Sequence, residues 1–125
     1  MTKRRPTAAE LEILNVLWDR GPSTVREVHE ALGERGSGYT TVLKFMQIMA
    51  EKGLVRRDEK QRAHVYEARL PREQTQTQLV RDLMDKVFNG SASRLIMNAL
   101  SGRKASAAEL AEIRRTLDEM ERNAQ

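Results

Sequence analysis

The sequence predicts a mainly α-helical protein that contains a small β-hairpin. Apolar residues recur every three or four positions in six segments, which is the periodicity of amphipathic helices. Only between residues 54 and 69 does the pattern change to the alternation that is typical of strands. Helix-start signals and glycines separate these segments, so each element can be assigned in chain order.

A first helix is predicted from about residue 8 to residue 20. The stretch "TAAE", Thr7 to Glu10, has the form of a capping box, in which a hydroxyl and a carboxylate bond to the free amides of a helix start. A second and shorter helix starts at Ser23 or Thr24 and extends to about residue 32.

The third helix is predicted in the stretch "GYTTVLKFMQIMAEKGLV", residues 38–55, and is expected to end at Gly53. One of its faces is apolar and is expected to contact the core. The opposite face is polar and consists of Thr40, Lys44, Gln47 and Glu51.

Two strands of a hairpin are predicted at residues 54–58 and 63–69, with a charged turn between them. Three short helices followed by a hairpin with a basic tip is the element order of a winged helix-turn-helix. Residues 1–70 are therefore predicted to form a winged helix-turn-helix DNA-binding domain.

Residues 71–125 are predicted to form a three-helix dimerisation domain. Their apolar stripes are wider than three short helices can cover among themselves, and each buried Leu or Met would stabilise by roughly 1.5–3 kcal/mol. A two-fold symmetric protein can also match two half-sites on DNA. The expected dimerisation residues are Leu79, Leu83, Val87, Leu95, Ile96, Leu110, Ile113 and Leu117.

The composition argues against several classes of protein. The 125 residues include no cysteine and two histidines, so no metal site and no cofactor are expected. No nucleophile–base pair and no Gly-rich phosphate loop occur, so an enzyme is not expected. No apolar run approaches the roughly 20 residues of a membrane span, and no signal-like start is found, so a cytoplasmic protein is predicted.

The first half of the chain offers groups that suit double-stranded DNA. Gln can bond adenine, Thr can contact thymine, and Lys can reach guanine or a phosphate. The net charge is +4, and basic residues gather at the hairpin tip, where they suit phosphate contacts. The predicted DNA-contacting residues are Ser23, Thr24, Arg26, Tyr39, Thr40, Thr41, Lys44, Gln47, Arg57, Lys60 and Arg62.

Short motifs give the chain a resemblance to a known family. They are LWxxGPxT around Trp18, YTTV from Tyr39, EKGLV from Glu51 and FNGS from Phe88. In this combination, and over about residues 8–122, the chain resembles the penicillinase-repressor (BlaI/MecI/CopY) family. The copper-responsive branch of that family has a C-terminal cysteine motif, which this sequence lacks.

The resemblance implies a homodimeric transcriptional repressor of antibiotic-resistance or envelope-stress genes. Such proteins bind inverted-repeat operators of the TACA/TGTA type, and some have Lys where Thr40 stands here. A membrane-bound sensor metalloprotease is often encoded beside the repressor, and cleavage in the dimerisation domain releases the DNA. The cleaved bond in the best-known members is Asn-Phe, which corresponds to Asn98–Ala99 in this chain.

The residues themselves leave alternatives open. The polar face of the third helix can be an ordinary solvated face, and the apolar stripes of the second half can fold back onto the first. A winged-helix protein-interaction module, without sequence-specific DNA binding, is the alternative function. His64 can meet a phosphate or serve in hairpin packing.

Overall fold

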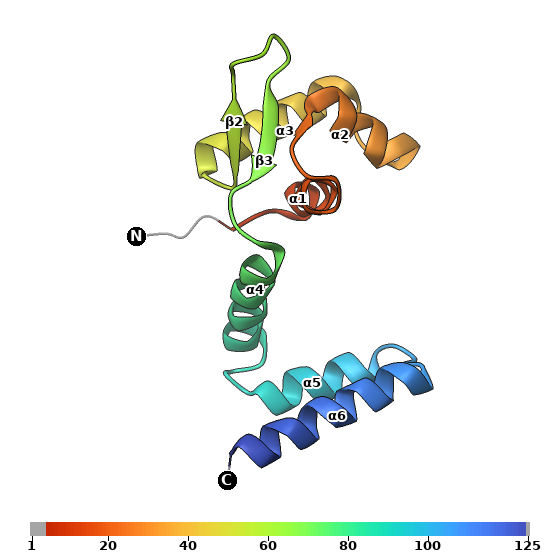
Figure 1. Ribbon diagram of the computed structural model, residues 1–125. Helices are drawn as coiled ribbons and strands as arrows, with labels where there is room; N and C mark the ends of the chain where they lie inside the picture. The colour runs from red at the N-terminus through yellow and green to blue at the C-terminus, as the bar shows by residue number, and fades with distance from the viewer. Residues whose placement is uncertain (1–4, 125) are drawn as a thin grey trace. The chain divides into compact units, whose positions relative to one another are not determined.

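The computed structural model describes residues 5–124, and the chain divides into two compact units, residues 1–80 and 81–125. The first unit contains three helices, a three-stranded sheet and the start of a fourth helix (Figure 1). Its elements are α1 (Ala8–Arg20), β1 (Ser23–Thr24), α2 (Val25–Leu32), the 3-10 turn η1 (Gly33–Arg35), α3 (Tyr39–Lys52), β2 (Val55–Asp58), β3 (Val65–Ala68) and the first part of α4 (Arg72–Val87). The expected mainly helical fold with a small β component is confirmed.

Capping boxes fix the starts of α1 and α2. Thr7 Oγ1 accepts from the amide of Glu10, and the Glu10 carboxylate accepts from the amide of Thr7. Thr24 and Glu27 form the same reciprocal pair at α2, at 3.2 and 2.9 Å. Thr24 rather than Ser23 is therefore the N-cap of α2.

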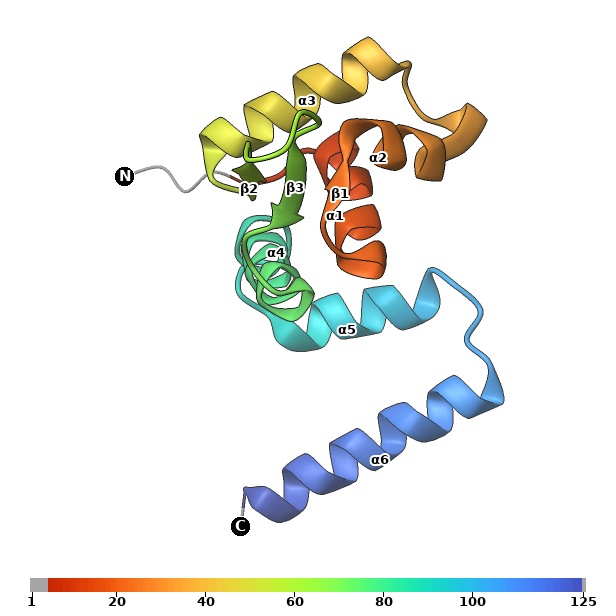
Figure 2. The same cartoon turned by 45° about the horizontal axis from the view of Figure 1, so that its top comes forward.

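Ser23 belongs instead to β1, a strand that the sequence pattern did not predict. The sheet has the order β1-β3-β2 (Figure 2). Both pairings are antiparallel, and Tyr66 of β3 pairs with Ser23 on one side and with Arg57 on the other. The hairpin strands β2 and β3 are shorter than predicted. A strand of two residues is too short to show alternation, so only its pairing with β3 reveals β1.

The core of the first unit lies between α1, α2, α3 and the sheet. Val42, Met46 and Met49 on the inner face of α3 are buried, as the periodicity predicted. Tyr66 of β3 is 1% exposed and joins the sheet to the helices. The other buried apolar residues are Ile13, Leu14, Leu17, Val25, Val28 and Val55.

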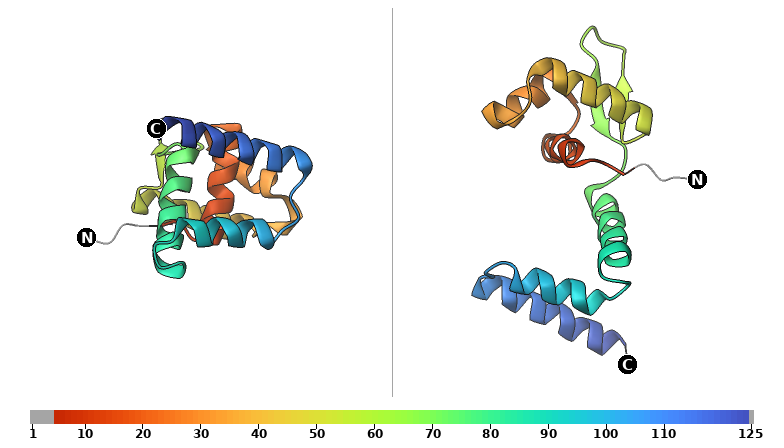
Figure 3. Two further views of the ribbon diagram at one scale, coloured as in Figure 1. Left: turned by 90° about the horizontal axis from the view of Figure 1, so that it is seen from below. Right: turned by 180° about the vertical axis from the view of Figure 1, so that it is seen from behind.

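The second unit consists of the end of α4, α5 (Ala92–Ser101) and α6 (Ala107–Asn123). A connection of residues 102–106 joins α5 to α6 (Figure 3). None of the described residues from 81 to 124 is buried. The division between the units falls within α4, after Val80, whereas the sequence pattern predicted a domain boundary before Pro71.

Two kinds of site are absent from residues 5–124. No helix in this range has both the length and the apolar character needed to cross a membrane. The same residues include no group of three or more His, Cys, Asp or Glu side chains that could hold a metal ion.

Candidate nucleic-acid interface

The polar face of α3 is exposed along the helix. Thr40, Lys44 and Gln47 are all exposed, and their spacing of four and three residues places them on one face. Glu51, one turn further, is also exposed and adds a negative charge near the end of that face. The structure thus brings together the three residues that were predicted to contact bases.

The start of α3 presents free backbone amides. Gly38 is the N-cap and has no side chain to bond to them, and Tyr39, Thr40 and Thr41 are exposed in the first turn. The Tyr39 ring packs edge-on against His29 of α2, with 6.0 Å between the centroids. Exposed amides at a helix N-terminus attract anions such as phosphate.

A cavity of about 380 Å³ lies between α2, α3 and the wing, which we define as β2, β3 and residues 59–64 between them. Most of the exposed DNA contacts that were predicted outside the polar face of α3 line this cavity. One residue of that polar face, Gln47, lines it as well. We call it the basic cavity, since three arginines line it. The predicted residues that line it are Thr24, Arg26, Tyr39, Gln47, Arg57 and Arg62.

Five lining residues of the basic cavity were not predicted DNA contacts, namely Val25, Leu43, Ala63, His64 and Tyr66. Leu43 belongs to the partly buried side of α3, so its helical position pointed to the core. His64, for which the sequence left two roles open, lines the cavity and lies 4.0 Å from the Glu59 carboxylate. His64 lies beside α3 because β3 pairs antiparallel with β2 and so runs back towards the helix.

Ser23 lies apart from the other predicted contacts. Its side chain is 2% exposed, and its hydroxyl donates to the carbonyl of Gly21 at 2.9 Å. Pairing of β1 with β3 causes this burial, since it turns Ser23 towards the core. The Ser23 side chain is therefore not accessible to DNA in this structure.

Arg57 of β2 is exposed and interacts with neighbouring side chains of the wing. It forms a side-chain hydrogen bond with Tyr66, and this bond raises the pKa of the Arg57 guanidinium. The carboxylate of Glu59 lies 3.7 Å away, and the charge of Glu51 acts in the same direction. Arg57 thus contributes a positive charge to the lining of the basic cavity.

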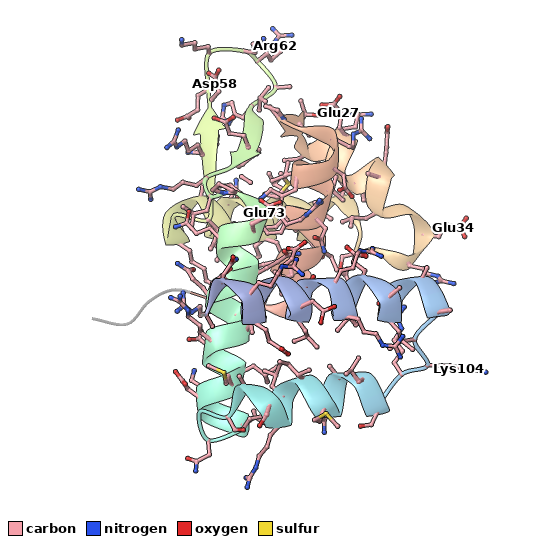
Figure 4. All side chains as sticks on the ribbon, turned by 60° about the horizontal axis from the view of Figure 1, so that its bottom comes forward. Glu27, Glu34, Asp58, Arg62, Glu73 and Lys104 are labelled. Carbon is pink, nitrogen blue, oxygen red and sulfur yellow. The ribbon has the colours of Figure 1, made fainter. Side chains whose placement is uncertain are left out.

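The tip of the wing is exposed and carries Lys60 and Arg62. The Lys60 amide donates to the carboxylate of Asp58 at 2.9 Å, which shapes the turn after β2. Arg62 lies at the tip of the loop, beyond Asp58 (Figure 4). Lys60 lines a separate cavity with Arg56 on the other side of the wing.

The second unit has an apolar groove of about 580 Å³ between α5 and α6. Predicted dimerisation residues that line this apolar groove are Leu95, Ile96, Ile113 and Leu117. Leu83 and Val87 are exposed on α4, at 47% and 65%. The remaining two, Leu79 and Leu110, are half-buried.

The bond between Asn98 and Ala99 lies inside α5. Both residues are exposed, and Ala99 also lines the apolar groove. A bond within a helix becomes available to a protease when the helix opens locally.

The fold, the exposed face of α3 and the basic wing define a winged-helix transcription regulator. A family model described as "Penicillinase repressor" matches residues 6–119. The chain therefore belongs to the penicillinase-repressor family. Proteins of this family are transcriptional regulators, so the chain is a repressor-type regulator and not an enzyme.

Two relatives found by sequence agree with this assignment. The chain is 35% identical over 115 residues to "Transcriptional regulator BlaI" of Mycobacterium tuberculosis, in strain CDC 1551 / Oshkosh and in strain ATCC 25618 / H37Rv. Each match covers 90% of this chain and 82% of the relative. A solved structure, the solution structure of the DNA binding domain of the repressor BlaI, is 23% identical to this chain, with a TM-score of 0.49. The match covers 57% of this chain and 90% of the solved chain.

Proposed function

We propose that the protein is a homodimeric transcriptional repressor that binds inverted-repeat operator DNA. The observation that carries this proposal is the basic cavity, which gathers polar and basic side chains from α2, α3 and the wing beside the exposed face of α3. In a helix-turn-helix, the second helix of the pair enters the major groove with its N-terminal residues foremost. In this protein, helix α3 is proposed to be the helix that enters the major groove.

The proposed contacts fall into two groups. Thr40, Lys44 and Gln47 contact base edges in the major groove, because their side chains carry the donors and acceptors that bases recognise. The other predicted contacts, without Ser23, position the protein on phosphates. They are Thr24, Arg26, Tyr39, Thr41, Arg57, Lys60 and Arg62.

The exposed second unit supports dimerisation. None of its described residues is buried, yet an apolar groove runs between α5 and α6, and Leu83 and Val87 add exposed apolar surface on α4. A segment with so little internal burial lacks the apolar contacts that would stabilise it alone. We propose that a second copy of the chain covers these surfaces, and that the resulting two-fold axis matches the inverted repeat.

Release from DNA is proposed to follow cleavage by a membrane-bound sensor metalloprotease at Asn98–Ala99. The bond is exposed, and α5 has 10 residues, none of which is buried, so local opening of the helix costs little free energy. Cleavage there separates α6 from the rest of the chain and removes one wall of the apolar groove. The controlled genes are proposed to serve antibiotic resistance or envelope stress.

An electrophoretic shift assay on the DNA upstream of the protein's own gene tests operator binding. We expect a shift at an inverted repeat, and a steep loss of affinity with salt at a slope near −0.9 per neutralised phosphate. Failure to shift any nearby inverted repeat, at any salt concentration, would favour a winged-helix module that binds a protein partner.

The size of the protein in induced cells tests the proposed cleavage. A shortened chain ending at Asn98 is expected when the target genes are derepressed. An intact chain under the same conditions would point to a different release mechanism.

A further inference from the structure

The Glu59 carboxylate lies between two groups of the wing that can bind an anion. Its Oε2 is 3.7 Å from the Arg57 guanidinium, and its Oε1 is 4.0 Å from Nε2 of His64. A guanidinium is always charged, and an imidazole Nε2 that carries a proton can donate to an anion in the neutral ring as well as in the charged one. Two donors from different parts of the wing thus flank one anion.

Sheet geometry places these donors on the side of the wing that faces α3. Arg57 pairs with Tyr66 across β2 and β3, so their side chains share one face of the sheet. Both residues line the basic cavity together with His64. The neighbouring pair, Arg56 and Glu67, lies on the opposite face, where it lines a separate cavity. The space between Arg57 and His64 is therefore on the face that is proposed to meet DNA.

The two contacts of Glu59 are long and exposed to solvent. At 3.7 and 4.0 Å they are ion pairs beyond hydrogen-bond distance, and the Glu59 side chain is 59% exposed. Exposed ion pairs contribute little stability, because water solvates the separated charges well. Exchange of this carboxylate for another anion therefore costs little free energy.

Arg57 has a second contact that does not depend on Glu59. Its side chain forms a hydrogen bond with Tyr66, which is buried in the core, and this bond raises the pKa of Arg57 more than any nearby charge does. The charge of Glu59 has the next largest effect, and that of Glu51 has a smaller one. Departure of Glu59 thus leaves Arg57 bonded to the sheet and its charge available to an incoming anion.

A DNA phosphate has the chemistry of an anion that fits this place. Like a carboxylate, it carries one negative charge on two free oxygens, so it can accept from a guanidinium and an imidazole at once. The DNA backbone presents such a group at every nucleotide. A phosphate and the Glu59 carboxylate cannot occupy the same place, because their charges repel each other.

We propose that the Glu59 carboxylate occupies, in the free protein, the place that a DNA phosphate takes between Arg57 and His64. Glu59 is thus a competitor of DNA within the wing, and it lowers the affinity of the wing for the DNA backbone. This inference rests on the proposed function, since it requires that the wing contacts DNA. It requires neither an inverted repeat nor a dimer.

The test measures the DNA affinity of the full-length protein with and without the Glu59 charge. The variant is Glu59→Gln, which keeps the size of the side chain. The probes are the inverted repeat upstream of the protein's own gene and an unrelated duplex of the same length, at one salt concentration. Glu67→Gln is the matched control, because it removes the same charge from the opposite face of the wing.

We expect Glu59→Gln to bind both probes more tightly than wild type, by roughly two- to fivefold, as expected for the loss of an exposed ion pair that competes with DNA. Glu67→Gln should change either affinity by less than about 1.5-fold, because salt screens a charge that does not contact Arg57 or His64. Unfolding midpoints should be unchanged in Glu59→Gln, since Glu59 is exposed in a loop.

A double-mutant cycle separates direct competition from a general effect of charge. Removal of the Glu59 charge should strengthen binding less in the Arg57→Gln and His64→Gln backgrounds than in wild type, because a group that Glu59 occupies is then missing. Equal gains in all three backgrounds would refute the inference, since they would show that Glu59 repels DNA without occupying a phosphate site.

The outcomes also separate this inference from the proposed function. If wild type binds neither probe, both fail. If wild type binds the inverted repeat and Glu59→Gln binds no more tightly, the competition by Glu59 is refuted and the repressor function stands. Weaker binding of Glu59→Gln would refute it too, because Glu59 would then order Arg57 and His64 for DNA. If the expected gain occurs on both probes but wild type prefers neither, Glu59 competes with phosphate and operator recognition fails.

Discussion

Lys52 and Glu10 form a partly buried ion pair that joins the end of α3 to the start of α1. The Lys52 Nζ donates to both carboxylate oxygens of Glu10, at 2.8 and 3.1 Å. The Glu10 side chain is 3% exposed and that of Lys52 is 23% exposed. Glu10 also accepts from the amide of Thr7, so one carboxylate caps α1 and anchors the helix that carries the proposed base contacts.

Removing the lysine charge should destabilise the first unit. Lys52→Met leaves a buried carboxylate without its partner, which costs about 3 kcal/mol in comparable buried pairs. Thermal or urea unfolding measures the free energy of unfolding directly. Lys104→Met, at an exposed position between α5 and α6, is the control, and an equal effect of the two substitutions would contradict the importance of the pair.

Gln47→Ala and Lys44→Ala should each weaken binding to the operator. A lost base contact costs about 1–3 kcal/mol and relaxes sequence preference at that position. Affinity for the operator and for unrelated DNA, measured at one salt concentration, distinguishes a base contact from a phosphate contact. Gln76→Ala on the exposed part of α4 is the control, and unchanged operator affinity of both α3 variants would refute a reading role for α3.

Arg62→Ala should weaken binding to all DNA sequences alike. Arg62 lies at the wing tip, where it is proposed to contact a phosphate. Loss of one phosphate contact reduces the slope of log affinity against log salt concentration by about 1 per protomer. The control is Lys104→Ala, which removes a positive charge from the second unit and should leave the slope unchanged. If Arg62→Ala also leaves the slope unchanged, the wing tip does not contact a phosphate.

Leu117→Asp and Ile113→Asp should shift the protein towards monomer. Both residues line the apolar groove, and a carboxylate there would have to be desolvated when a second copy covers it. Sedimentation velocity over a range of concentrations measures the change. Leu117→Met keeps the groove apolar and should remain dimeric, whereas persistent dimers of both Asp variants would move the interface to another surface.

The capping box of α2 should contribute a pH-dependent part of the stability. Hydrogen bonds from the Thr24 amide and side chain lower the pKa of the Glu27 carboxylate below its ordinary value of 4.5. The stabilisation is therefore present above pH 4.5 and is lost as the pH falls through the lower folded-state pKa. Unfolding midpoints should differ between wild type and Glu27→Gln near neutral pH and converge in acid, while Glu30→Gln on the same helix serves as the control.

Much of the fold was predictable from local patterns. The capping signal at Thr7 and the apolar periodicity of α3 depend on residues within a few turns of one another, so they are visible in the sequence. The exposed face with Thr40, Lys44 and Gln47 followed from the same periodicity. The family was likewise indicated by short motifs around Trp18 and Tyr39, each of which lies within a few consecutive residues.

Other features depended on residues far apart in the chain. Strand β1 has two residues, and it is defined by pairing with β3, which buries Ser23. The basic cavity forms because the wing returns Arg57 and His64 towards α3.

The attachment of α4 likewise depends on Trp18 and Leu70, which are 52 residues apart. Local periodicity specifies which face of each helix is apolar and hence the class of fold. Tertiary packing alone decides which polar residues share a site and where one unit ends, because hydrogen bonds and ion pairs between distant residues leave no periodic signal in the sequence.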